Sequence, residues 1–324
     1  MSEITESVCI DAQACNGCGR CVDICPVGTL DMEALKARVV SARCIECGHC
    51  MAVCEPAAIL VKGIDPNGLV LKTLQVPDAW LPYGQFDAAA LVQLMRSRRS
   101  CRHYTGRAVD SAVLEDLVRI GVSAPSGTNS QLWTFTILPT RSAVEALAGQ
   151  VGDFFKRLNR MAENPLIRAC APLLGRAELA SYYRRHYASV KRAIADWEER
   201  GIDPLFHGAP AVIIIGSQPG GAAPQDDALL ASQNILLAAH ALGLGTCLIG
   251  FAVAALRRDP TIQKRLGIPR EETVYAVIAV GYPDRTFVRC AGRKKPVVRV
   301  LSLEGGGPPL SAGRTSVFAP RAAP

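Results

Sequence analysis

The chain has 324 residues, of which 49% are hydrophobic and 6% aromatic. This length suits two domains, and no apolar run reaches the roughly 20 residues that a membrane-spanning helix requires. The formal charge of +7 is uneven: residues 1–76 hold 6 basic and 9 acidic residues, which gives −3, and the remainder holds 30 and 20, which gives +10. A basic domain suits anionic ligands, but few aromatic residues and no recognition motif argue against nucleic acid. We expect a soluble, cytoplasmic protein that binds neither nucleic acid nor membrane.

Two similar cysteine runs near the N-terminus hold eight of the 13 cysteines. Each has the spacing C-x2-C-x2-C-x3-C, followed by Pro26 in the first run and by Glu55-Pro56 in the second, and this spacing resembles that of two-cluster bacterial ferredoxins. In such proteins three cysteines of a run ligate one [4Fe–4S] cluster, and the fourth ligates the other cluster. The predicted ligand sets are Cys15, Cys18, Cys21 and Cys54 for cluster 1, and Cys44, Cys47, Cys50 and Cys25 for cluster 2.

Zinc ions and disulfide bonds are the alternative uses of so many cysteines. Zinc sites usually bind one ion through four ligands and pair two CxxC units across a longer spacer. A disulfide framework requires an oxidising compartment, whereas the N-terminus has no basic segment followed by an apolar stretch, and the cysteine total is odd. Two [4Fe–4S] clusters are therefore the favoured interpretation.

Beyond the cysteine runs, residues 63–86 contain repeated Gly and Pro and predict an extended linker strapped to a surface. Asp87 and Asp110 are each placed to cap a helix. The later apolar segments predict three buried strands, at Leu132–Leu138, Ala211–Gly216 and Val274–Gly281, and a nearly all-apolar helix in a core or dimer interface, at Asp226–Leu242.

The domain boundaries follow from these elements. We expect a cluster domain with the start of the linker at 1–77, a second domain at 78–304 and a mobile tail at 305–324. Residues 152–208 predict a helical excursion, in which one helix face carries Tyr183, Tyr187, Val190, Ile194 and Trp197. This stripe either packs on the core or belongs to a lid over a substrate pocket. The candidate pocket residues are Tyr183, Tyr187 and His207.

Several short motifs follow one another in the second domain. Arg98-Arg99-Ser100-Cys101-Arg102 follows a helix, and the segment Ala124–Trp133 leads into a strand. Further along lie Leu244-Gly245, Gly281-Tyr282-Pro283 and the basic segment Arg293–Pro296. In order and spacing these motifs resemble the FMN-dependent nitroreductase family over roughly residues 90–300. With the cysteine runs they resemble its ferredoxin-fused members.

The resemblance implies an α+β fold: a nitroreductase-like α/β/α sandwich with a small N-terminal bacterial ferredoxin-like domain. It also implies bound FMN and a homodimer. The implied contacts of the FMN phosphate and ribityl chain come from Arg98, Arg99, Ser100, Arg293 and Lys295. The implied contacts of the ring come from Arg102, Ser126, Gly127, Asn129, Gln131 and the backbone of Ile249 and Gly250. Ser126 is equally well explained as an ordinary turn residue.

No dinucleotide-binding fingerprint is present, because Gly243-x-Gly245 follows a helix and lacks the third glycine. We therefore expect a low-potential donor (ferredoxin, flavodoxin or NAD(P)H) to deliver electrons through the two clusters to FMN. FMN would then reduce an electron-poor small molecule, such as a nitroaromatic, quinone or activated alkene, by hydride transfer. No catalytic side chain is required. Two alternatives stay open: a dehydrogenase or oxidase that passes substrate electrons out through the clusters, and a non-catalytic electron carrier or redox sensor.

Overall fold

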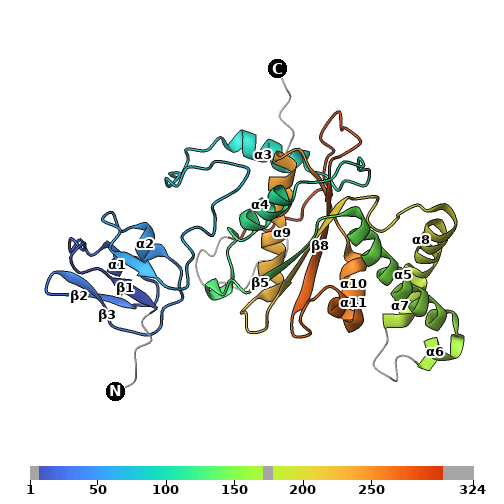
Figure 1. Ribbon diagram of the computed structural model, residues 1–324, viewed down its shortest axis with the longest axis horizontal. Helices are drawn as coiled ribbons and strands as arrows, with labels where there is room; N and C mark the ends of the chain where they lie inside the picture. The colour runs from blue at the N-terminus through green and yellow to red at the C-terminus, as the bar shows by residue number, and fades with distance from the viewer. Residues whose placement is uncertain (1–6, 171–177, 302–324) are drawn as a thin grey trace. The chain divides into compact units, whose positions relative to one another are not determined.

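The computed structural model describes residues 7–170 and 178–301, and Figure 1 shows its elements. The described residues up to Thr286 form one compact unit, and the described residues from Phe287 onward form a second. The expected tail at 305–324 lies outside the described residues. In the part of the chain that the structure describes, no helix combines the length and the apolar character needed to cross a membrane.

The cysteine-rich module consists of two short antiparallel β-ladders and two one-turn helices. β1 (Val8–Ile10) pairs with β4 (Ile59–Val61), and β2 (Leu30–Glu33) pairs with β3 (Lys36–Val39). The helices are α1 (Arg20–Asp23) and α2 (His49–Ala52). The core of this module is small and includes Val8, Leu30, Ala37, Ile59, Val61 and the side chains of Cys21 and Cys50. A module with so little apolar core depends on further bonds for its stability.

The linker between the module and the larger domain contains no helix or strand over residues 62–87. It is bound to α4 (Ser111–Gly121) by Asp116, whose side chain is fully buried. This carboxylate accepts hydrogen bonds from the N–H of Lys72 at 2.7 Å and from the N–H and hydroxyl of Thr73, each at 2.6 Å. The linker is therefore strapped to α4 through its main chain.

A four-stranded antiparallel sheet, in the order β5-β6-β8-β7, lies at the centre of the larger domain. Its strands are β5 (Trp133–Leu138), β6 (Ala211–Ser217), β7 (Gly245–Leu248) and β8 (Thr273–Gly281). Three of them lie where strands are predicted. The sequence did not predict β7, because it is short and opens on glycine, which indicates the end of a helix.

Side chains of β6 alternate between two hydrophobic clusters, so both faces of the sheet are covered. Val212 and Ile214 lie in the cluster that contains side chains of α5 (Arg141–Glu163) and α10 (Gly250–Arg258). Ile213 and Ile215 lie in the cluster that contains side chains of α4 and α9 (Pro224–Ala241). Figure 1 shows these helices on either side of the sheet. The predicted α/β/α sandwich is confirmed.

Aspartate residues begin two of the predicted helices. Asp87 accepts hydrogen bonds from the first turn of α3 (Ala88–Ser97), and Asp110 does the same for α4. These contacts satisfy main-chain N–H groups that the helix leaves without a partner. Both caps confirm the sequence prediction. The remaining helices are α6 (Pro165–Cys170), α7 (Glu178–Arg185), α8 (Tyr187–Arg200), α11 (Pro260–Arg265) and a 3₁₀ turn at Gly127–Asn129.

The helical excursion differs from its prediction in two ways. Its first helix, α5, begins at Arg141 rather than near residue 152, because Thr140 caps it directly after β5. The aromatic stripe does not lie on one helix, because the chain breaks at His186 between α7 and α8. Val190 is consequently buried against the core, whereas Tyr183 is exposed. The second half of the stripe packs on the core, which is the first of the two interpretations given above.

Candidate functional site

Each predicted cysteine set lines a small cavity of its own. The cavities are lined by Cys15, Cys18, Cys21 and Cys54 in one case, and by Cys25, Cys44, Cys47 and Cys50 in the other. The fourth cysteine of each run thus lies with the first three of the other run. The structure brings together the residues of each set, and their function as cluster ligands is a prediction.

Main-chain N–H groups donate to several of these sulfurs. The Thr29 N–H donates to Cys25 Sγ at 3.2 Å, and the Ala58 N–H donates to Cys54 Sγ at 3.2 Å. In each case the donor lies four residues after the cysteine that accepts the hydrogen bond. The two exchanged cysteines therefore accept equivalent hydrogen bonds. Donors aimed at sulfur stabilise a thiolate, which is the form that ligates iron. The residues of both cavities fit [4Fe–4S] clusters.

The loop that carries Cys15 shows why glycine is required between the cysteines. Gly17 has a φ of 73°, and a Cβ atom there would lie 2.2 Å from the carbonyl oxygen of Leu35. Hydrogen bonds from the backbone of Ala37 and of Gly17 lower the pKa of the Cys15 thiol. The close backbone approach and the stabilised thiolate are consistent with a ligand loop.

The segment from Arg98 to Tyr104, which carries several predicted flavin contacts, lies along the β7 edge of the sheet. Ser100 forms a parallel bridge with Thr246, and the Cys101 N–H donates to the Thr246 carbonyl at 2.8 Å. At the other end of the segment, Tyr104 is bridged to the residues that follow β8. Burial raises the pKa of the Tyr104 phenol. The sheet edge thus fixes the backbone from which the arginines project, and Arg99 is half-buried there.

The positive charge of Arg102 affects titratable groups on β7 and on the loop before β6. Burial raises the pKa of the Cys247 thiol, while Arg102 and a hydrogen bond with Ser100 act in the opposite direction. Burial lowers the pKa of His207; the positive charge of Arg102 also lowers it, and Asp203 opposes this. The charge of Arg102 therefore acts on both His207 and Cys247. A positive site of this kind suits an anionic ligand.

The second predicted flavin loop is held in place by a buried carboxylate on α9. Asp227 accepts a hydrogen bond from the Gly127 N–H at 2.9 Å and from the Ser130 hydroxyl at 3.4 Å. Thr128 and Asn129 have φ values of 52° and 55°, in the left-handed region. Such backbone strain persists only where surrounding contacts impose it, and Asp227 supplies two of these contacts.

Ser126 closes this loop. Its hydroxyl accepts a hydrogen bond from the Gln131 N–H at 3.1 Å, and Gln131 has a φ of 48°. This contact gives Ser126 the turn function that is the alternative to flavin ligation. The indole Nε1 of Trp133, two residues further on, is buried, with no hydrogen-bond partner among the described residues.

Asn129 contacts the cysteine-rich module. Its Nδ2 donates to the carbonyl oxygens of Ile45 at 3.1 Å and Glu46 at 2.9 Å, both between the first two cysteines of the second run. Sequence reasoning placed this side chain at the flavin ring and gave no indication of a contact across 83 residues. The structure therefore brings the second cysteine run and the predicted flavin loop together.

One predicted flavin contact has a partner within the sheet. The Ile249 N–H donates to the Val277 carbonyl at 2.8 Å, because the pairing between β7 and β8 continues to this residue. That N–H is therefore used within the sheet, and flavin contacts from the backbone of Ile249 and Gly250 stay a prediction. Arg293 and Lys295 lie in the second compact unit, where they are exposed and outside any helix or strand.

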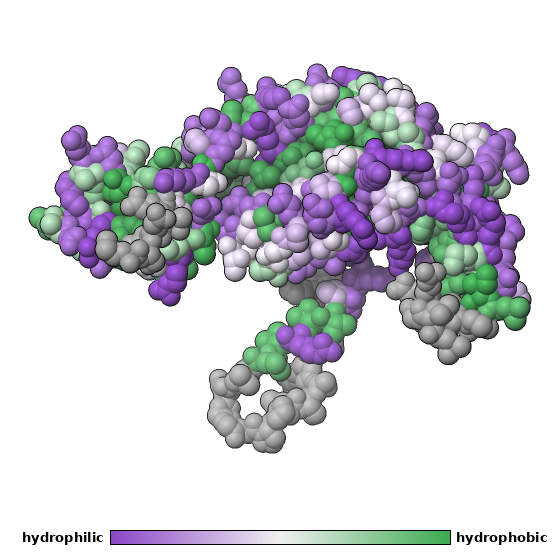
Figure 2. Space-filling view, turned by 60° about the horizontal axis from the view of Figure 1, so that its bottom comes forward, coloured by the Kyte–Doolittle hydropathy of each residue, from purple (hydrophilic) through white to green (hydrophobic). Residues whose placement is uncertain are grey.

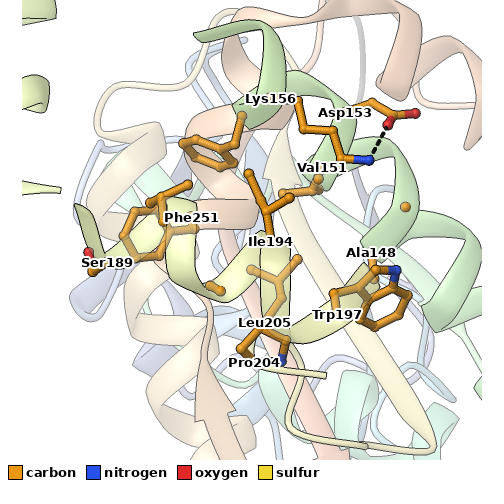
Figure 3. Close-up of a pocket in the computed structure, with 15 residues that line it drawn as sticks. Ala148, Val151, Asp153, Lys156, Ser189, Ile194, Trp197, Pro204, Leu205 and Phe251 are labelled. Atoms are coloured by element: carbon orange, nitrogen blue, oxygen red, sulfur yellow. Dashed lines mark hydrogen bonds and ion pairs between the residues drawn. The ribbon is translucent and has the colours of Figure 1, made fainter. Parts of the chain in front are cut away.

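A larger cavity, of about 340 Å³, lies between α5, α8 and the start of α10. Figure 3 shows Ile194, Trp197 and Phe251 around it, with the ion pair of Lys156 and Asp153 at its rim. Its lining is mostly apolar and aromatic, which is typical of small-molecule sites. The predicted pocket residues Tyr183, Tyr187 and His207 are not part of this lining.

Sequence reasoning missed the buried carboxylates that organise the site. Asp227 and Asp116 are 4% and 0% exposed, respectively, and each accepts hydrogen bonds from a segment distant in sequence. Asp203 accepts from three N–H groups of its own loop and forms an ion pair with Arg141 at 2.8 Å. Asp227 lies in the first turn of α9, where acidic residues are common, so its position in the sequence gave no signal of this function.

Comparison with known proteins shows two family matches. The model of the nitroreductase family matches residues 95–282, and the model of the 4Fe-4S dicluster domain matches residues 7–55. These matches confirm both resemblances found in the sequence, and the second confirms the prediction of two [4Fe–4S] clusters.

Individual relatives are distant. Iodotyrosine deiodinase of Nematostella vectensis is 21% identical over 241 residues, which cover 69% of this chain and 83% of that protein. Iodotyrosine deiodinase of Haliscomenobacter hydrossis is 26% identical over 230 residues, which cover 63% and 88%. A crystal structure of a nitroreductase with bound FMN from Desulfitobacterium hafniense aligns with a TM-score of 0.48 and 22% identity, over 64% of this chain and 97% of that one.

Proposed function

Because the chain belongs to the nitroreductase family and carries a 4Fe-4S dicluster domain, we propose that it is an FMN-dependent iron–sulfur oxidoreductase. Electrons from a low-potential donor enter through the two clusters and serve to reduce an electron-poor small molecule at the flavin site. When bound, the clusters supply one-electron transfer, and FMN supplies the exchange between single electrons and electron pairs. Nitroaromatics, quinones and activated alkenes are the proposed substrate classes.

The observation that carries this proposal is the contact between the two redox parts of one chain. The Asn129 side chain, in the predicted flavin loop, donates to two carbonyls of the second cysteine run. Two unrelated binding modules would require no such contact. The contact supports an internal path between the clusters and the flavin site.

The chain's own residues fit an FMN phosphate and ring. Arginine binds phosphate through two parallel hydrogen bonds, and the segment that carries Arg98, Arg99 and Arg102 is fixed along β7. Ser100 projects from the same segment toward Cys247. The buried Trp133 Nε1, which has no hydrogen-bond partner in the described part of the chain, lies at the end of the loop expected to approach the ring. We propose that these groups hold the cofactor, and the family resemblance adds Arg293 and Lys295 as proposed phosphate contacts.

The cavity beside α10 supports an enzyme over a closed electron carrier. Phe251, which lines it, follows Gly250 directly in the chain. A cavity wall therefore begins one residue after the proposed flavin contact. Because its lining is mostly apolar and aromatic, including Trp197 and Ile194, it suits an aromatic or quinonoid substrate.

Homodimer formation, which we also propose, is supported by apolar side chains on the surface of two helices. The exposed residues are Leu91, Val92 and Met95 of α3, and Leu229 and Leu230 of α9. Figure 2 shows hydrophobic areas between hydrophilic ones on the face in view. Clustered apolar surface is typical of subunit interfaces. The exposed Leu229 and Leu230 are consistent with the prediction that the helix Asp226–Leu242 lies in a core or a dimer interface.

An anaerobic spectroscopic titration tests the proposed function. The purified holoprotein is titrated with reduced ferredoxin, NADH and NADPH, and then with a nitroaromatic, a quinone and an activated alkene. We also include 3-iodotyrosine, because several distant relatives are named deiodinases. We expect cluster and flavin absorbance to bleach with ferredoxin and to recover with at least one acceptor. Failure of every acceptor to reoxidise the protein would support the carrier alternative.

The cofactor site has its own test. The double variant Arg98→Ala/Arg293→Ala should lose FMN on gel filtration while retaining its iron, because the phosphate loses its guanidinium partners. Retention of the yellow colour of FMN would show that the phosphate lies elsewhere.

A further inference from the structure

One peptide group lies between Asn129 and a predicted cluster ligand. Asn129 Nδ2 donates to the Ile45 carbonyl at 3.1 Å. The Ile45 carbonyl and the Glu46 N–H belong to the same peptide unit, and this N–H donates to Cys44 Sγ at 3.3 Å. The Asn129 amide and the Cys44 sulfur therefore bind opposite ends of one peptide plane.

Hydrogen bonds that share a peptide group strengthen one another. A donor on the carbonyl oxygen polarises the peptide and makes its N–H a better donor. Hydrogen bonds to cysteine sulfur stabilise the additional negative charge of a reduced cluster and so raise its reduction potential. The Asn129 side chain is consequently placed to affect the cluster of Cys25, Cys44, Cys47 and Cys50 without touching it.

The geometry at both ends of this link is fixed by other contacts. On the larger domain, Asn129 has a φ of 55°, in the loop that Asp227 holds. On the module, Glu46 has a φ of 52°. Its carboxylate packs against Gly63, where an added Cβ atom would lie 1.8 Å from the Glu46 Oε2. Two strained residues facing each other indicate a contact that the surrounding structure imposes.

We propose that Asn129 is a positioning residue that docks the second cysteine run on the larger domain and raises the reduction potential of cluster 2 through the Ile45–Glu46 peptide. This inference rests on the proposed function, because it requires that both clusters bind. It assigns to the larger domain a specific influence on one of the two clusters. Cluster 1, held by the other cysteine set, is the internal reference.

Two variants test the link in the holoprotein. Asn129→Asp keeps the shape of the side chain and replaces the donor by a carboxylate that repels the two carbonyls. Asn129→Gly removes the side chain and tolerates the left-handed backbone, so it serves if the first variant folds poorly. Asn234→Ala is the matched control, because this asparagine donates to Ser123 on the surface, at 3.2 Å, outside the link.

The measurement is a redox titration of both clusters followed by electron paramagnetic resonance. We expect the midpoint potential of cluster 2 to become more negative in both Asn129 variants, and more so in Asn129→Asp, while cluster 1 and the control stay at wild-type values. Hydrogen exchange of residues 44–48 should also rise in both variants. FMN content and turnover are measured separately, so that a failure of the proposed function is recognised by itself.

Three results would overturn the inference. Unchanged potentials in both variants would show that the link has no influence on the cluster. Equal shifts of both clusters would indicate a general effect on the module. Loss of FMN with unchanged potentials and unchanged hydrogen exchange would make Asn129 a flavin ligand instead.

Discussion

The cysteine-rich module and the larger domain solve the problem of holding a redox site in opposite ways. In the module the proposed ligands themselves complete the core, since Cys21 and Cys50 are buried among only a few apolar side chains. In the larger domain a sheet covered on both faces forms the core, and the site residues project from its edge. The module should therefore need its clusters to fold, whereas the larger domain should fold without its cofactor.

The largest expected effect is the loss of a cluster from the module. Cys54→Ser should reduce the iron content from about eight to about four atoms per chain and abolish the hydrogen-exchange protection of β1 and β4, while β6 and β8 stay protected. Iron analysis and exchange mass spectrometry measure this. Cys9→Ser, which changes a cysteine that lines neither cavity, is the control.

Double variants test whether the fourth cysteine of each run ligates the cluster of the other run. If Cys54 belongs with Cys18, the variant Cys54→Ser/Cys18→Ser should keep as much iron as Cys54→Ser alone. The variant Cys54→Ser/Cys47→Ser should lose nearly all iron. The reverse result would show that each run holds its own cluster.

The core of the larger domain provides the opposite test. Ile213→Ala, at a fully buried position of β6, should lower the free energy of unfolding by about 2–5 kcal/mol and leave the iron content unchanged. Denaturant unfolding followed by circular dichroism measures the loss. Val288→Ala, at a position that is 95% exposed, should change little. A parallel loss of iron would contradict the independence of the two parts.

A smaller effect is expected where the linker is bound to α4. Asp116→Asn presents an amide to the Lys72 and Thr73 donors, and an unsatisfied buried group costs about 1–3 kcal/mol. Burial opposes ionisation of Asp116, but the hydrogen bonds from Lys72 and Thr73 outweigh it and lower the pKa of the carboxyl. Its stabilising effect is therefore present above the ordinary pKa of about 3.9 and is lost as pH falls through the lower folded value.

The measurement is urea unfolding of the wild type and Asp116→Asn at a series of acidic pH values. The stability difference between them should shrink as pH falls into that range. Asp78→Asn, in an exposed part of the same linker, is the control. A difference that does not depend on pH would show that the ionised carboxylate contributes nothing specific.

The smallest effect concerns His207, beside the basic segment. Because burial lowers its pKa below 6.5, protonation is easier in the unfolded chain. The native state therefore loses stability as pH falls from about 6.5 toward the folded value. His207→Asn should reduce this loss, by less than the effect of Asp116→Asn, in thermal unfolding scans between about pH 7 and 5. An unchanged pH profile would contradict the lowering of the His207 pKa by burial.

Local features of both parts could be predicted from the sequence. Three cysteines of each set follow from local spacing, and the exchanged fourth was assigned from the resemblance to two-cluster ferredoxins. The caps at Asp87 and Asp110 are local as well. Strands buried on both faces, such as β6, were visible as apolar runs. The contact of Asn129 with Ile45 and the bonds of Asp116 to the linker could not be predicted, because they depend on how distant segments meet.

The flavin site lies between these cases. The basic segment was recognised from its residues. Its pairing with β7 was not predicted, because β7 begins with Gly245 and was not recognised as a strand. The backbone contact at Ile249 was assigned from the resemblance, and the pairing of that N–H with Val277 was visible only in the sheet. Sequence motifs therefore indicate which groups can contact a flavin, and the hydrogen bonds of the folded sheet determine which of these groups already have a partner.

The most direct test of the central claim, that the clusters supply the flavin site within one chain, is anaerobic stopped-flow reduction of the wild type and of Cys47→Ser. With reduced ferredoxin as the donor, we predict rapid bleaching of FMN in the wild type and a loss of this phase in the variant, with FMN still bound. Equally rapid bleaching of both proteins by NADH or NADPH would contradict the claim.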